Sequence, residues 1–206
     1  MARIKLQWWH EQINEKKGCS EHPLGRQLAD IYKNSESAHQ AFDLINIKTD
    51  QVLHRQPLNT INEYQKLCSD LGGSFADLIQ VVSDQPANDQ SKLAGTWIEH
   101  VENMQLFGKL LRENIHLIPI DVLKSSGLSN DQLLGSDKTA DVLKTLHNSI
   151  KEGLDQSFSD AISKKTCLGK LTKLRSNLMD LIEQEDMAVI NQRISLTPIR
   201  KLWLAL

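Results

Sequence analysis

Residues 102–121 of the chain read ENMQLFGKLLRENIHLIPID. The last five of these residues predict the end of one helix, a proline corner and the start of the next helix, because proline fits the first turn of a helix but disrupts its interior. Before this corner the pattern is helical, and Leu106 and Leu110 lie four residues apart on a face without a carboxylate of its own. Whether that face does any chemistry decides whether this chain is an enzyme.

The composition is typical of one globular domain: the chain has 206 residues, of which 40% are apolar and 24% are charged. Glycine (10) and proline (5) are both scarce, which favours long helices over a β fold with many turns. The formal net charge of −2 gives no general attraction to nucleic acid, and we expect no nucleic-acid partner. No stretch approaches the ~18 apolar residues of a membrane span, and the N-terminus carries no signal-peptide pattern.

Apolar residues recur at helical spacing along almost the whole chain. Thr60 followed by Glu63 predicts a capping box, and Gly127 predicts a helix end. Pro198 predicts a kink in the last helix. We expect helices at residues 4–18, 23–31, 38–53, 60–82, 90–114, 120–126, 137–163, 170–183 and 186–206. The sequence therefore predicts an all-α fold, with residues 1–206 as a single domain of about eight helices.

Generic catalytic motifs are missing. Gly72-Gly73 lacks the lysine and the hydroxyl residue that follow in a phosphate-binding loop. His10-Glu11 begins like a zinc-protease helix, but Asn14 stands where the second histidine ligand belongs. The seven histidines are scattered, with no pair four residues apart, so we expect most of them on the solvated surface.

The adjacent tryptophans Trp8 and Trp9 point in directions about 100° apart if they lie on a helix. One interpretation is that they are packing anchors; the other is that they form an aromatic wall for an apolar ligand or a partner. The three cysteines, Cys19, Cys68 and Cys167, are too scattered for a disulfide framework or a zinc site. We interpret them as reduced thiols of a cytosolic type of compartment.

Several motifs resemble those of the squalene/phytoene synthase family, and they occur in the family's order. Residues 3–11, RIKLQWWHE, resemble the family helix R-x-x-W-W-R-x-x-L, and residues 22–24, HPL, resemble the start of its next helix. Further similar segments are 58–64 (LNTINEY), Cys68 with Gly73, Ala94-Gly95, 117–121 with Gly127-Leu128, and 198–203 (PIRKLW). The resemblance implies a helical bundle of the isoprenoid-synthase type that lacks the family's first helices, because only seven residues precede Trp8.

Catalytic members of this family condense two isoprenoid diphosphates head to head. Two aspartate-rich motifs on facing helices hold the Mg²⁺ ions that neutralise the leaving diphosphate. A gap-free alignment with the second motif places Leu106 and Leu110 at its two aspartates. The same alignment puts Glu102 at an asparagine and Gln105 at an arginine, whereas Arg112 is retained.

Leucine cannot ligate magnesium, so the resemblance implies no metal and no cofactor unless carboxylates come from elsewhere. Asp50 stands two residues before Val52, where the family usually has an aspartate. Glu99 and Glu102 share a helix face, and we interpret them as solvated or paired surface acids. The candidates for the substrate cavity are Trp8, Trp9, Asp50, Glu102, Gln105 and Arg112, and the degenerate metal-motif positions are Leu106 and Leu110.

Three functions remain open. The first is a non-catalytic member that works as an assembly or interaction factor, because the family includes mitochondrial complex I assembly factors, and bacterial relatives of them, that also lack intact aspartate motifs. The second is an active prenyltransferase that takes Mg²⁺ ligands from another chain or from an upstream segment. The third is an isoprenoid- or lipid-binding module that keeps the apolar cavity without metals.

Partners and location follow from the same features. Without the family's first helices the domain would expose apolar surface, so we expect a protein partner or self-association. The segment Ile194–Leu206 is apolar and basic; it either packs on the core as a terminal helix or makes peripheral contact with a membrane or a partner. We expect a bacterial cytoplasmic or mitochondrial-matrix type of location.

Overall fold

The computed structural model describes residues 35–154 and 165–205, together with Ile4, Gln7, Trp8, Glu11, Pro23 and Arg26. Within this part the chain forms helices and turns and no strand, which confirms the predicted all-α class. The elements in chain order are α3 (Glu36–Leu53), α4 (Ile61–Cys68), the π-helix η1 (Ser69–Gly73), α5 (Ser74–Val82), α6 (Asp89–Arg112), α7 (Ile120–Ser126), the 3-10 turn η2 (Asn130–Gln132), α8 (Thr139–Gly153), α10 (Cys167–Gln184) and α11 (Pro198–Ala205).

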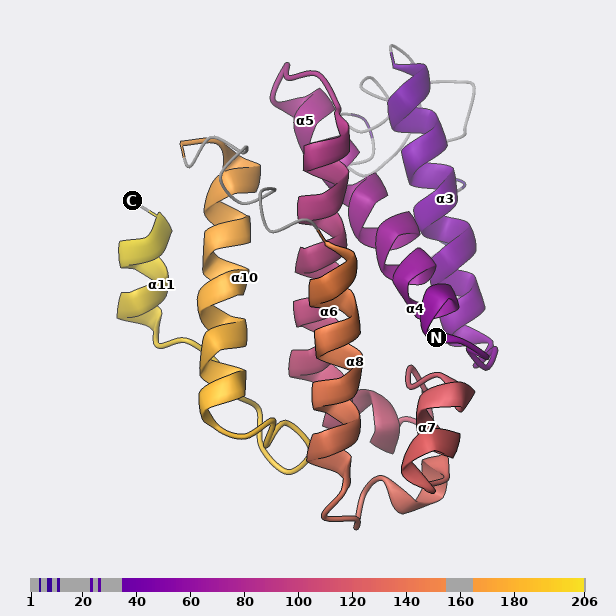
Figure 1. The fold of residues 1–206 in the computed structure, drawn as a ribbon. Coiled ribbons are helices and arrows are strands. Elements are labelled where there is room, and N and C mark those ends of the chain that lie inside the picture. Colours follow the sequence, from indigo (N-terminus) through magenta and orange to yellow (C-terminus); the bar gives the residue numbers. More distant parts are fainter. Residues whose placement is uncertain are drawn as a thin grey trace.

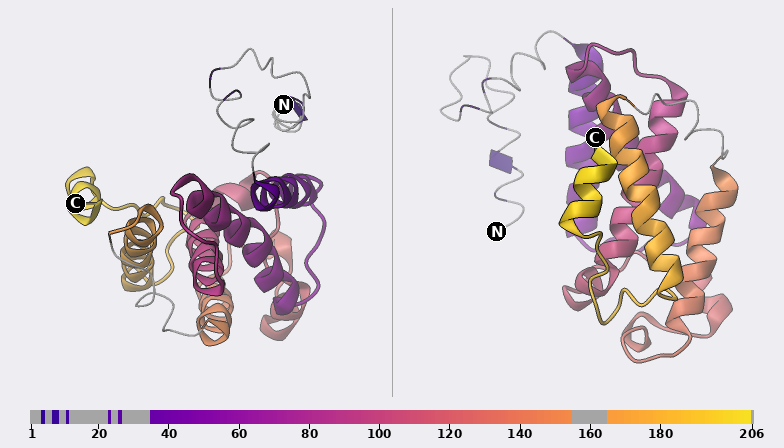
Figure 2. Two further views of the ribbon diagram at one scale, coloured as in Figure 1. Left: turned by 90° about the horizontal axis from the view of Figure 1, so that it is seen from above. Right: turned by 90° about the vertical axis from the view of Figure 1, so that its left-hand side faces the viewer.

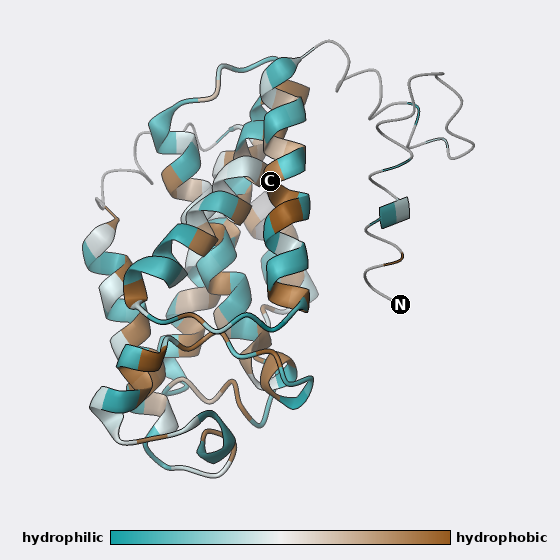
Figure 3. Cartoon of the chain, turned by 90° about the vertical axis from the view of Figure 1, so that its right-hand side faces the viewer, coloured by the Kyte–Doolittle hydropathy of each residue, from teal (hydrophilic) through white to brown (hydrophobic). Residues whose placement is uncertain are grey.

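Helix α6 is the centre of the bundle. It contacts α4, η1, α5, α8 and α10, and Figures 1 and 2 show α10 and α11 on one side of it, α3 and α4 on the other, and α8 alongside. Its buried residues lie on nearly all sides, as expected for a helix enclosed by others: Ala94, Gly95, Thr96, Trp97, Ile98, His100, Val101, Met104, Phe107 and Leu111. The surrounding helices are amphipathic, and Figure 3 shows hydrophilic and hydrophobic patches alternating around them.

The closest contact in the bundle joins the backbones of η1 and α6 at Gly72 and Gly95. A methyl group on either α-carbon would overlap the carbonyl oxygen of the other glycine. The two helices can touch at this point only because neither residue has a side chain. The contact places the continuous helical segment formed by α4, η1 and α5 against the middle of α6.

The proline corner binds the start of α4 to the start of α7. The backbone N–H groups of Ile120 and Asp121 donate to the carbonyls of Leu58 (2.9 Å) and Asn59 (3.1 Å). In return the Asp121 carboxylate accepts from the backbone N–H of Ile61 at 3.1 Å. Two segments that resemble the family in sequence are therefore neighbours in space.

Helix ends follow the predicted residues closely. Gly127 ends α7 with a left-handed φ of 69°. The Thr60 hydroxyl accepts from the backbone N–H of Glu63 at 3.3 Å, as the capping signature predicts. The Glu63 carboxylate, however, accepts from the backbone N–H of Asn59 at 2.7 Å and not from that of Thr60.

The expected helix over residues 186–206 is wrong in its first half. Residues 185–197 form turns and extended chain, Asp186 and Met187 have φ of 53° and 58°, and α11 begins at Pro198 without the predicted kink. The cause lies in α6, where bare Gly108 lets the carbonyls of Val189 and Ile190 come close. Side chains of α6 then donate to carbonyls of this segment, Arg112 to Ile190 and Gln105 to Ile194, in place of helical hydrogen bonds.

Other predictions fall outside the described residues. The expected helices at 4–18 and 23–31 lie largely there, as do residues 155–163 of the helix expected at 137–163, whose described part ends at Gly153. Within the described part, no helix is long and apolar enough to cross a membrane.

The glycine contact gives a test of this packing. Gly95→Ala should lower the free energy of unfolding by about 3 kcal/mol, because the added methyl group forces α6 and η1 apart. Gly73→Ala is the matched control: its methyl group would lie 3.7 Å from Lys92, and alanine favours the helix by up to about 1 kcal/mol. Urea denaturation measures both, and equal destabilisation of the two variants would contradict the packing described.

Candidate functional site

The face of α6 that aligns with the second aspartate motif is partly a packing surface. Leu110 packs against the hydrophobic core, and Leu106 is half-buried. Among the described residues, no group of three or more His, Cys, Asp or Glu side chains is arranged to hold a metal ion. Leucines in the two ligand positions do not fit Mg²⁺, which takes oxygen ligands.

Arg175 of α10 joins two of the predicted site residues. Its guanidinium donates to the Glu102 carboxylate at 2.7 Å and to the Gln105 side-chain carbonyl at 3.4 Å. The Glu102 charge is therefore neutralised within the fold. The expectation of a paired acid is confirmed for this residue.

Gln105 and Arg112 of α6 hold the backbone of the segment that follows α10. The Gln105 amide donates to the carbonyl of Ile194 at 2.8 Å, and the Arg112 guanidinium donates to the carbonyl of Ile190 at 2.9 Å. Both residues, which the sequence suggested for a substrate cavity, thus make structural hydrogen bonds to main-chain carbonyls.

The remaining predicted site residues lie elsewhere. The Asp50 carboxylate is on α3 and lies 3.1 Å from Nδ1 of His54. Trp8 is 39% exposed, and Trp9 is outside the described residues.

Glu99 differs from the expectation of a surface acid. Burial, aided by the negative charge of Glu102, raises the pKa of its carboxyl to about 7, against opposing effects of Asn103 and Arg175. Asn103 also reaches Cys68, with its amide nitrogen 3.8 Å from the thiol sulfur. This side of α6 therefore carries a partly buried polar cluster beside Leu106.

Two histidines also depart from the surface expectation. His100 on α6 and His147 on α8 are at most 1% exposed, and Nε2 of the first lies 3.0 Å from Nδ1 of the second. His100 receives a further contact from the Tyr64 hydroxyl at 3.0 Å. The sequence contained one indication that a histidine is buried: His147 lies in the apolar stripe of α8, between Leu143 and Ile150.

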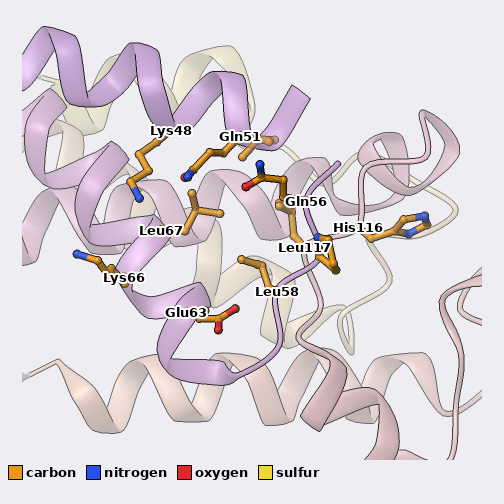
Figure 4. Close-up of a pocket in the computed structure, with 11 residues that line it drawn as sticks. Lys48, Gln51, Gln56, Leu58, Glu63, Lys66, Leu67, His116 and Leu117 are labelled. Carbon is orange, nitrogen blue, oxygen red and sulfur yellow. The ribbon is translucent and has the colours of Figure 1, made fainter. Parts of the chain in front are cut away.

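A pocket of about 210 Å³ opens between α3, α4 and the segments around residues 57 and 116 (Figure 4). Its apolar lining is Val52, Pro57, Leu58, Leu67 and Leu117, and its polar lining is Lys48, Gln51, Gln56, Glu63, Lys66 and His116. The two lysines share the carboxylate of Asp70, at 3.2 and 3.5 Å. None of the eight site positions suggested by the sequence lines this pocket, although Val52 does.

A comparison with protein families matches residues 1–161 to squalene/phytoene synthase. The chain belongs to the squalene/phytoene synthase family. A search of curated proteins finds no match. The family match includes α6 but ends before α10, which provides Arg175.

The raised pKa of Glu99 predicts a pH-dependent gain in stability when the acid is removed. Above its ordinary pKa of 4.5 the unfolded chain carries an ionised Glu99, whereas the folded chain keeps the proton up to about pH 7. This group therefore lowers stability as the pH rises from 4.5 to 7. Glu99→Gln should raise the free energy of unfolding by about 1–2 kcal/mol at pH 8 and leave it unchanged at pH 4.

Chemical denaturation at the two pH values measures this effect. Glu152→Gln, at an exposed position on α8, is the control and should change little at either pH. A Glu99→Gln variant that is less stable than the parent at pH 8 would show that the ionised carboxylate is favoured where it lies.

Proposed function

We propose that this protein is a non-catalytic member of the squalene/phytoene synthase family that works as an assembly or interaction factor, of the kind that serves respiratory complex I. The proposal is supported by the α6 face, where the gap-free alignment places Leu106 and Leu110 against the two aspartates of the family's second motif. A diphosphate in a mostly apolar site without cations would be strongly disfavoured. Glu102, one turn before Leu106, is neutralised by Arg175.

Exposed apolar residues at the outer edge of the bundle support an interaction role. Helix α11 packs on α10 and is anchored by Leu204, which is 2% exposed. Its opposite side presents Ile199 and Leu202, which are 82% and 64% exposed, beside the exposed cations of Arg200 and Lys201.

Both sequence interpretations of the segment Ile194–Leu206 therefore have support, since part of it packs on the core and part faces outward. We propose the outward side of α11 as the contact for a protein partner or for the surface of a membrane, on the cytoplasmic or matrix side. Basic and apolar residues together suit a partner that is acidic and partly apolar.

A second candidate function is an isoprenoid- or lipid-binding module. The pocket in Figure 4 favours it, because an apolar lining with two lysines at one end suits an elongated apolar molecule with a polar head. An active prenyltransferase would need carboxylates from another chain or from residues outside the described part.

We first expect that the protein does not turn over isoprenoid diphosphates. Purified protein with farnesyl diphosphate and Mg²⁺ should release no pyrophosphate above the rate without protein, because Leu106 and Leu110 provide no oxygen ligands. Release that is abolished by EDTA would overturn the proposal in favour of the prenyltransferase. A rise in melting temperature with farnesol, in the absence of metal, would favour the binding module.

The role of α11 can be tested with two exposed substitutions. Ile199→Ser combined with Leu202→Ser should reduce co-purification of complex I subunits, or sedimentation with phosphatidylglycerol vesicles, at least fivefold. Both side chains are exposed, so the free energy of unfolding should change by less than about 0.5 kcal/mol. Ile47→Ser, which alters a 56% exposed residue on α3, is the control. Equal binding by the double variant and the parent would show that the contact lies elsewhere.

A further inference from the structure

The outer surface of α10 carries basic side chains on one face. Lys170, Lys173 and Asn177 follow one another at spacings of three and four residues, so they share a face of the helix. The Arg200 guanidinium of α11 donates to the side-chain oxygen of Asn177 at 3.2 Å. This hydrogen bond joins a cation of α11 to the face of α10 that carries the two lysines.

Acidic residues are absent from both segments that build this surface. Residues 165–179 and residues 187–206 contain no aspartate and no glutamate. The same two segments contain seven basic residues: Lys165, Lys170, Lys173, Arg175, Arg193, Arg200 and Lys201. Only Arg175 among them pairs with a carboxylate in a described ion pair, that of Glu102 on α6. The positive charge of this surface is therefore concentrated on α10 and α11.

Apolar side chains project beside these cations. Ile199 and Leu202 lie three residues apart on α11 and are largely exposed, whereas Leu204 is buried. Helix α11 packs on α10, and Figures 1 and 2 show it at the outermost edge of the bundle. An amphipathic helix with exposed aliphatic side chains and neighbouring lysines and arginines is typical of a helix that lies in the plane of a lipid surface.

We propose that the α10–α11 surface, defined by Lys170, Lys173, Ile199, Arg200, Lys201 and Leu202, docks on an anionic phospholipid bilayer. This inference rests on the interaction role proposed for α11 and names its partner. The two aliphatic side chains enter the layer between the headgroups and the acyl chains. The basic side chains lie at the level of the lipid phosphates, because their long aliphatic stems allow the charged ends to remain in the polar layer.

The composition of the surface favours a bilayer over an acidic protein. Lysine is depleted at interfaces between proteins, and a standard interface buries about 800 Å² on each partner. The described part of the α10–α11 surface instead has two exposed aliphatic side chains among three lysines and an arginine. A lipid surface needs no matching shape, and each basic residue close to it strengthens binding about fivefold.

Charge also sets the orientation on the bilayer. The second half of α10 and the residue after it carry the exposed acids Asp180, Glu183 and Glu185. An anionic surface repels these side chains and attracts Lys170 and Lys173. The first half of α10, together with α11, should therefore face the lipid, and the second half should point away from it.

Sedimentation of the full chain with vesicles tests the docking surface. The chain should bind vesicles of phosphatidylcholine with phosphatidylglycerol at least about tenfold more tightly than vesicles of phosphatidylcholine alone, because several cations contribute. Added sodium chloride should weaken this binding by screening the charges. Lys170→Gln combined with Lys201→Gln should weaken binding to the anionic vesicles at least about tenfold.

The matched control is Lys124→Gln combined with Lys138→Gln. It makes the same change in net charge at two exposed lysines, one on α7 and one just before α8. Binding of this variant should stay within about twofold of the parent, because charges far from the lipid are screened. Urea denaturation should show that both double variants fold with the stability of the parent.

Three results would overturn the docking proposal: no binding to any vesicle, equal binding to vesicles with and without phosphatidylglycerol, and equal binding by the two lysine double variants. Complex I subunits captured through Ile199 and Leu202, with no vesicle binding, would leave the proposed function standing and assign this surface to a protein. Vesicle binding together with EDTA-sensitive release of pyrophosphate would support the docking surface and refute the non-catalytic role.

Discussion

The backbone contact between Gly72 and Gly95 is the constraint on which the rest of the bundle depends. It fixes η1 against the middle of α6, with no side chains between the two helices. Because η1 is continuous with α4, the same contact sets the depth at which Tyr64 and Cys68 enter the core. These two residues are the ones that meet His100 and Asn103 of α6. A packing requirement therefore also determines which polar groups come together.

The polar side chains of α6 lie on three sides of the helix, and each side has its own surroundings. Gln105 and Arg112, with the bare Gly108 between them, hold main-chain carbonyls of the segment after α10. Glu99 is on another side, where burial raises the pKa of its carboxyl. His100 is on a third side and faces α8. Buried polar networks of this kind are stable only when nearly every member is satisfied, so each hydrogen bond restricts how α6 can rotate or shift.

The sequence predicted the fold where local chemistry decides it, and failed where distant contacts do. Pro119 and Gly127 act through their own backbone angles, so the start and the end of α7 could be placed from sequence. The segment from 185 to 197 could not, because its path depends on contacts with Gly108, which lies far away in the chain. His100 and His147 were missed for the same reason: a histidine looks like a surface residue until its partner on another helix is known. The assignment of Leu106 and Leu110 to motif positions rests on the alignment of one helix and stays a prediction.

Several polar side chains of α6 bind to residues that lie beyond the family match. The match ends at residue 161, and the partners of Glu102, Gln105 and Arg112 all come later in the chain, from α10 and the segment that follows it. Arg175 places a fixed positive charge beside the Glu102 carboxylate of α6. A guanidinium bound in this way neutralises a carboxylate without an open coordination position for a substrate. The part of the chain that follows the family match thus holds the polar side chains of α6 within the fold.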